Sequence, residues 1–170
     1  MAKKKKRLNV KFLIVMASIV VLLGGAALAY KTIPQVKWLV RGTPASHAAV
    51  ARQLFEQGRY EDAGEKYKRA IVLNRKPHPE YYTLLGDCYS HLVLEDAENI
   101  RLAKACWDQA LLAEPQYLPA LQRLLDLYRD DAELNRGPRA AAQWEAVHDT
   151  ARKILAIDPQ NRQAKALFHK

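Results

Sequence analysis

The chain has 170 residues, a length sufficient for one ordinary domain and one additional segment, and its formal net charge is +9. Its two cysteines are too few for a disulfide framework and lack the spacing of zinc ligands. Positive charge is concentrated at the N-terminus: ten of the 27 lysines and arginines precede Glu56, the first acidic residue, whereas 17 basic and 18 acidic residues follow from that point. The folded part therefore lacks the basic stripe of a nucleic-acid-binding protein, and we expect no nucleic acid among its partners.

The first predicted element is a transmembrane helix over residues 12–30. This stretch of 19 residues carries no charge, and at 1.5 Å per residue it would span about 28 Å, close to the hydrocarbon thickness of a bilayer. Lysine and arginine are denser in the basic tail of residues 1–11 than after the apolar stretch, so the positive-inside rule keeps that tail in the cytoplasm. The sequence predicts a single-pass membrane protein in which residues 31–43 are a juxtamembrane linker and the remainder lies outside, in bacteria in the periplasm.

The same segment also meets the requirements of a cleaved signal peptide. A basic start and an apolar core precede Ala27-Leu28-Ala29, so a signal peptidase would cut after Ala29 and release a secreted or periplasmic subunit. The apolar stretch is longer than a typical signal core of roughly 7 to 15 residues, which favours the anchor. Both alternatives place the rest of the chain on the same side of the membrane.

Residues 44–170 are predicted to be helical throughout, because apolar residues recur at intervals of three and four while Gly and Pro collect between segments. Helix ends recur at spacings of 35 to 44 residues, as helical hairpins of about 34 residues with insertions would give. The recurring residues are Leu54, Tyr89 and Tyr128 for the first helix of each unit, and Ala70, Ala110 and Ile154 for the second.

At these residues the sequence resembles the tetratricopeptide-repeat (TPR) family, whose units are pairs of antiparallel helices. The match is carried by Gly58, Tyr60, Ala63 and Tyr67 in the first unit, by Tyr82, Leu85, Gly86, Ala103, Trp107 and Pro115 in the second, and by Leu121, Leu124, Val147, Ala151 and Pro159 in the third. About five extra residues separate the helices of the second unit, and about ten around Asp130 to Pro138 separate those of the third.

This resemblance implies an all-α TPR solenoid behind the membrane helix. Its repeats would occupy about residues 44–78, 79–117 and 118–161, followed by a partial capping helix over residues 162–170. So short a cap would leave an apolar edge at Leu167 and Phe168, which is a candidate surface for self-association. Small residues such as Ala63, Ala70 and Gly86 are expected where the helices approach closely.

Nothing in the sequence predicts an enzyme, a cofactor or a metal site. The motifs of phosphate-binding loops, zinc peptidases and serine hydrolases do not occur. Glu145 and His148 have the spacing of di-iron ligands, but no second such pair accompanies them, so we expect a solvated helix face. In the TPR arrangement Cys88 would face the first unit and Cys106 the third, both as buried free thiols.

The resemblance implies a binding surface on the concave side, which the first helices line. The residues placed there are Arg52, Phe55, Glu56, Thr83, Asp87, Ser90, His91, Gln122, Asp126 and Arg129. The charges of Arg52, Asp87 and Asp126 would form successive rungs of one groove. The expected partner is another protein, contributing an extended segment or a helix and located in the cell envelope.

Chaperone-binding TPR domains hold the terminal carboxylate of a peptide with Lys, Asn and Arg. Ala48, Leu84 and Pro119 stand at three of those positions here, and only Arg52 and Arg123 remain. The sequence therefore argues against that ligand class, and it predicts a membrane-tethered scaffold for a different protein partner.

Overall fold

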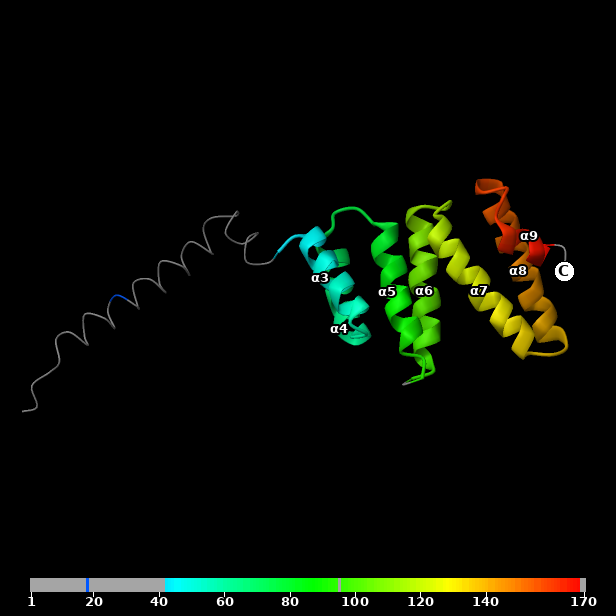
Figure 1. The fold of residues 1–170 in the computed structure, drawn as a ribbon, viewed down its shortest axis with the longest axis horizontal. Helices are drawn as coiled ribbons and strands as arrows, with labels where there is room; N and C mark the ends of the chain where they lie inside the picture. Colours follow the sequence, from blue (N-terminus) through cyan, green and yellow to red (C-terminus); the bar gives the residue numbers. More distant parts are fainter. Residues whose placement is uncertain (1–17, 19–41, 95, 169–170) are drawn as a thin grey trace, which may run out of the picture. The chain divides into compact units, whose positions relative to one another are not determined.

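The computed structural model describes residue 18, residues 42–94 and residues 96–168, and it divides the chain into two units, Met1–Thr43 and Pro44–Lys170 (Figure 1). Within the described residues no helix is both long enough and apolar enough to cross a membrane. The predicted membrane helix over residues 12–30 lies, apart from Ser18, outside the described residues, and so do the basic tail and nearly all of the linker. These three segments stay predictions.

The second unit is built from helices, and its described residues contain no strand, so the all-α prediction is confirmed for them. Each helix packs against the next along the chain, giving three hairpins (α3 with α4, α5 with α6, α7 with α8) and a last short helix, α9. The bounds are Pro44–Glu56 for α3, Tyr60–Leu73 for α4, Pro79–His91 for α5, Glu98–Ala113 for α6, Leu118–Leu134 for α7, Pro138–Ile157 for α8 and Arg162–Phe168 for α9.

Proline and glycine set several of the helix starts. Pro79, Pro119 and Pro138 occupy the first or second position of α5, α7 and α8, where the missing N–H costs no hydrogen bond and the fixed φ suits a helix. Gly58 and Gly137 adopt φ values of 76° and 71° in the turns before α4 and α8, a conformation that side chains with a Cβ rarely adopt. The hairpin turns are therefore encoded locally.

Small residues allow the helices within each hairpin to approach closely. Ala63, Ala70 and Ala110 are fully buried, and a Cβ on Gly86 would lie 2.5 Å from Nε1 of Trp107 and 3.0 Å from the carbonyl oxygen of Ala103. At Gly86, α5 therefore lies directly against α6, in contact with the indole of Trp107. The predicted role of these small residues as close-contact positions is confirmed.

The two predicted insertions have different structures. In the second hairpin the extra residues lie in the connection between α5 and α6, over residues 92–97. In the third hairpin they lengthen the helices instead, so that α7 has 17 residues and α8 has 20. The apolar face of α7 continues through Ala132, which is buried, so helix pairing goes on beyond the usual repeat length.

Both cysteines are free, and Cys88 packs as predicted in the core of the first hairpin. The predicted orientation of Cys106 is wrong, because Cys106 packs against that same core rather than toward the third hairpin. Ala103, Trp107 and Ala110 occupy the face of α6 that contacts α7, which leaves position 106 on the side of α4. Burial raises the pKa of Cys88 to about 12 and that of Cys106 to about 11, so both are protonated at neutral pH.

His148 also differs from its prediction. Glu145 is exposed, as expected, but His148 is half-buried next to Trp144, and in the described part of the chain its Nε2 atom is buried without a hydrogen-bond partner. The elongation of α7 and α8 extends the packed face to residues that a repeat of ordinary length would expose. No group of three or more His, Cys, Asp or Glu side chains among the described residues is arranged to hold a metal ion.

Candidate protein-binding groove

A hollow of about 620 Å³ is formed by α3, α5, α6 and α7, and we call it the groove. It is lined by Phe55, Leu84, Asp87, Ser90, His91, Ile100, Trp107, Arg123, Asp126, Leu127 and Asp130. Residues of the three first helices supply most of this lining, and the second helix α6 adds Ile100 and Trp107. The groove therefore draws on all three hairpins.

Apolar side chains line part of the groove, and we call them the floor: Leu84 of α5, Ile100 and Trp107 of α6, and Leu127 of α7. Trp107 is almost fully buried. Trp107 reaches this position because Gly86 has no side chain in its path. An apolar floor gains free energy when a partner's side chain displaces water from it.

Two aromatic rings, Phe55 and His91, form one wall, and Tyr60 supports them from outside the lining. Phe55 meets Tyr60 edge to face, with ring centroids 5.1 Å apart, and meets His91 in the same manner at 5.3 Å. Tyr60 and His91 are stacked, with centroids 4.2 Å apart and an interplanar angle of 7°. Each such ring pair contributes about 0.5 to 1.5 kcal/mol beyond its buried area. The wall is thus held in place before any partner binds.

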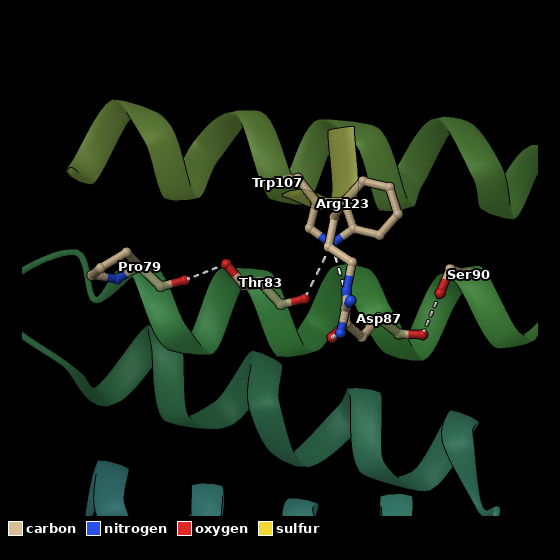
Figure 2. A network of polar contacts seen from close by, with 6 residues as sticks. All are labelled: Pro79, Thr83, Asp87, Ser90, Trp107 and Arg123. Carbon is tan, nitrogen blue, oxygen red and sulfur yellow. Dashed lines mark hydrogen bonds and ion pairs between the residues drawn. The ribbon is translucent and has the colours of Figure 1, made fainter. Parts of the chain in front are cut away.

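A polar network centred on Asp87 crosses the groove (Figure 2). Arg123 donates to both carboxylate oxygens of Asp87, from Nε at 2.8 Å and from Nη2 at 3.0 Å, and Nε1 of Trp107 donates to Oδ1 at 3.2 Å. The Asp87 side chain is only 8% exposed, and hydrogen bonding to it raises the pKa of Arg123. A buried carboxylate satisfied in this way is a structural ion pair rather than an open charge.

Side-chain bonds join each first helix to the next. Arg52 of α3 pairs with Glu80 of α5 at 2.8 Å. The Asp87–Arg123 pair then connects α5 to α7, and Gln163 of α9 donates to Asp126 of α7. These three cross-links therefore connect α3 to α5, α5 to α7 and α7 to α9.

Five of the ten predicted site residues line the groove: Phe55, Asp87, Ser90, His91 and Asp126. The other five do not: Arg52, Glu56, Thr83, Gln122 and Arg129. Thr83 is buried, and its hydroxyl donates to the carbonyl of Pro79. Asp87 lines the groove but is not the open charged rung that the sequence suggested, because Arg123 neutralises it.

The six lining residues absent from the prediction fall into two groups. Arg123, Leu127 and Asp130 share one helical face of α7 with Asp126, and Leu84 lies on α5 one turn before Asp87 and Cys88, so helical periodicity extends to these four. Ile100 and Trp107 belong to a second helix, which the family arrangement does not place on this surface. Gly86 is the one signal for Trp107, since it removes the side chain that would block the indole.

A second hollow of about 510 Å³ continues from the groove, because Ile100, Leu127 and Asp130 line both. It lies where α7 diverges from α6 toward its C-terminal end (Figure 1), and Leu134 and Arg139 form its far side. A partner segment longer than the groove therefore has a continuous path onto the third hairpin.

The sequence matches no protein-family model, and it matches none of the curated proteins. Among solved structures it is similar to one described as the first TPR of Spaghetti (RPAP3) bound to the HSP90 peptide SRMEEVD, with a TM-score of 0.58 and 16% identity over 75% of this chain and 90% of that one. It is also similar to the crystal structure of MamA, with a TM-score of 0.57 and 17% identity over 84% of this chain and 70% of that one. Identities this low establish the fold alone. Residues 44–168 therefore have the tetratricopeptide-repeat fold that the sequence resembles.

Proposed function

We propose that this domain is a protein-binding scaffold that holds an extended segment or a helix of another protein in the groove. The observation that carries the proposal is the combination of an apolar floor with polar groups that already bond one another. Such a surface gains free energy from burying apolar side chains and loses little by desolvating its charges. Phe55, held by two aromatic neighbours, is the residue expected to contribute most.

The groove has no features of an active site, which supports a scaffold rather than an enzyme. Ser90 is the only lining residue with an aliphatic hydroxyl, and its Oγ donates to the backbone carbonyl of Asp87 rather than to a base. The carboxylate of Asp87 is committed to Arg123 and Trp107. The described lining therefore supplies no activated nucleophile.

The acidic peptide named for the RPAP3 structure is a poor model for the partner of this chain. Ala48 is buried, Leu84 forms part of the apolar floor, and Pro119 lies in the first turn of α7. The two remaining arginines, Arg52 and Arg123, are engaged by Glu80 and Asp87. The described groove thus offers no cationic clamp for a terminal carboxylate.

The proposal includes a membrane anchor at residues 12–30, with the TPR domain on the outer side and an envelope protein as partner. The uncharged length of that segment and the basic tail before it support this location. Cleavage after Ala29 is the alternative. The intact mass of the mature protein distinguishes the two: a mature N-terminus at Tyr30 would rule out the anchor, whereas an intact N-terminus retained in membranes through a carbonate wash would support it.

Crosslinking and capture from intact membranes tests the binding role. Phe55→Ala should reduce recovery of the crosslinked partner at least about 10-fold, because hot-spot aromatics contribute 2 kcal/mol or more. Leu112→Ala is the matched control, since Leu112 is 76% exposed and lies outside the groove. Equal capture by both variants would exclude the groove as the binding surface.

Self-association through the C-terminal edge is the second candidate. Leu167 is buried in the core of the third hairpin, so the edge is smaller than expected, and Phe168 is its exposed part. Loss of a dimer on Phe168→Ala, measured by sedimentation of the detergent-solubilised chain, would support this candidate.

A further inference from the structure

Acidic side chains outnumber basic ones in and beside the groove. Three arginines stand with four carboxylates, namely Arg52, Arg123 and Arg129 with Glu80, Asp87, Asp126 and Asp130. The formal charges of this set, +3 and −4, sum to −1. The groove is therefore slightly acidic although the whole chain is basic.

Each of these arginines is already engaged by a carboxylate. Arg52 pairs with Glu80 and Arg123 with Asp87, while Arg129 contacts Asp126 at 3.0 Å and Asp130 at 2.8 Å. An acidic partner would have to separate one of these pairs before gaining a contact. A basic partner meets a smaller obstacle, because Asp126 and Asp130 share a single guanidinium and their side chains are 39% and 60% exposed, although Asp126 also accepts a hydrogen bond from Gln163.

These two carboxylates lie directly beside the apolar floor. Asp126 and Asp130 are one helical turn apart on α7, and Leu127 between them is part of the floor, as is Ile100 on α6. A partner side chain buried against Leu127 and Ile100 would therefore place its sequence neighbours within reach of both carboxylates.

The second hollow does not reverse this balance. It contributes three cations, and each already has an anionic neighbour: Arg101 pairs with Glu98, Lys104 with Asp108, and Arg139 with Asp131. A segment that continues into this hollow gains apolar contact with Leu134 and meets paired charges.

We infer that the groove selects a segment of another protein in which lysine or arginine stands next to a large aliphatic or aromatic residue. This inference rests on the proposed function and specifies the chemistry of its partner. The apolar side chain enters the floor between Leu127 and Ile100, and the cation contacts Asp126 and Asp130. Charge complementarity of this kind sets specificity and association rate more than total affinity.

The test is an unbiased selection of short peptides on the full-length chain in a non-ionic detergent. Selected peptides should be enriched in Lys or Arg beside Leu, Ile or Phe. Replacing those cations by Glu should weaken binding about 10-fold at low salt, measured by fluorescence anisotropy, and the difference should shrink to about 2-fold at high salt.

Two double variants isolate the charge effect. Asp126→Asn with Asp130→Asn keeps the side-chain shapes and should reduce the preference for basic over acidic peptides to about 2-fold or less. Glu145→Gln with Asp149→Asn changes the net charge equally on α8, away from the groove, and should leave the preference intact. Loss of the preference in both variants would overturn the assignment of the two groove carboxylates.

The outcomes separate this inference from the proposed function. Selected peptides that are acidic or uncharged, yet lose binding in Phe55→Ala, would overturn the inferred charge class and leave the groove as a binding site. A selection without any peptide sensitive to Phe55→Ala would count against both. A peptide copying residues 1–11 that binds more tightly than the selected ones, and depends on Phe55, would assign the groove to a second copy of this chain and would also overturn the proposed placement of tail and domain on opposite sides of a membrane.

Discussion

Arg123 forms a two-point ion pair with Asp87 across 36 residues of sequence, and in doing so it joins the second hairpin to the third. The carboxylate is 8% exposed and the guanidinium half-exposed, so the pair lies at the edge of the core. Arg123→Ala would leave Asp87 buried with Trp107 as its remaining side-chain donor. We expect a loss of about 1 to 3 kcal/mol in the free energy of unfolding, less than for a fully buried pair.

Urea unfolding of the purified chain measures this loss. Arg152→Ala is the control, since Arg152 is exposed and contacts Asp149 at 3.6 Å, and exposed pairs contribute about 0.2 to 1 kcal/mol. Equal effects of the two variants would mean that the Asp87 network does not join the hairpins.

Gly86 and Gly64 are both helical glycines in the core, and they should respond oppositely to alanine. A Cβ at position 86 would lie 2.5 Å from Trp107 Nε1 and 3.0 Å from a backbone oxygen, so the indole must move and its bond to Asp87 is lost. Gly86→Ala should cost about 1 to 3 kcal/mol and shift the tryptophan fluorescence. A Cβ at position 64 would meet nothing nearer than 3.6 Å, and alanine is favoured over glycine in a helix by about 1 kcal/mol.

Thermal unfolding of the two variants should therefore give a lower Tm for Gly86→Ala and an unchanged or higher Tm for Gly64→Ala. Destabilisation of similar size at both positions would show that the α5–α6 approach is not specifically tight at the indole.

Cys88, which is buried, and Cys106, which is partly buried, should make the folded chain less stable at alkaline pH. The pKa of Cys88 is raised by burial from 9.0 to about 12, and that of Cys106 from 9.0 to about 11. Unfolding releases these thiols to deprotonate, so the stability they contribute is complete below about pH 9 and is lost as the pH rises from there toward the folded-state values. Burial also raises the pKa of Tyr67, which adds a similar loss, but only above the ordinary tyrosine value of 10.0.

Unfolding free energies at about pH 8 and about pH 10 should therefore differ, and the difference should be smaller in Cys88→Ala. Iodoacetamide should label Cys88 slowly in the folded chain and rapidly in denaturant. Fast labelling of Cys88 under native conditions would contradict its burial.

The proposed orientation in a membrane should depend on the basic residues before residue 12. Replacing Lys3 through Arg7 with neutral residues and adding lysines after Lys31 should invert a fraction of the molecules. A reporter fused after Lys170 would detect the inverted fraction. A reporter that stays wholly outside would show that charge does not set the orientation.

Sequence periodicity was sufficient to predict the helical hairpins but not every neighbour relationship between them. The alanines of each hairpin and Gly86 follow from the repeat pattern, because small residues recur at fixed places in it. The pattern identifies the apolar face of α6 but not the helix that each side of it contacts, which is why Cys106 was assigned to the wrong neighbour. The repeat spacing places the extra residues of the third hairpin between its two helices, whereas they lengthen the helices, since an insertion changes the spacing of a repeat without revealing its conformation.

The site was predicted only in part for a related reason. A stripe along one helix follows from periodicity, so Asp126 led to the correct face of α7. The pairing of Asp87 with Arg123 depends on how two hairpins dock, and no local pattern connects residues so far apart. The same docking brings Trp107 into the floor, and it decides which predicted charges remain available to a partner.

The three cross-links between first helices also have a mechanical consequence. Pulling neighbouring first helices apart would strain Arg52–Glu80, Asp87–Arg123 and Asp126–Gln163, whereas compression is resisted by the close-packed helices themselves. Tension on the domain should therefore loosen the exposed Arg52–Glu80 pair before the Asp87–Arg123 pair, whose carboxylate is buried.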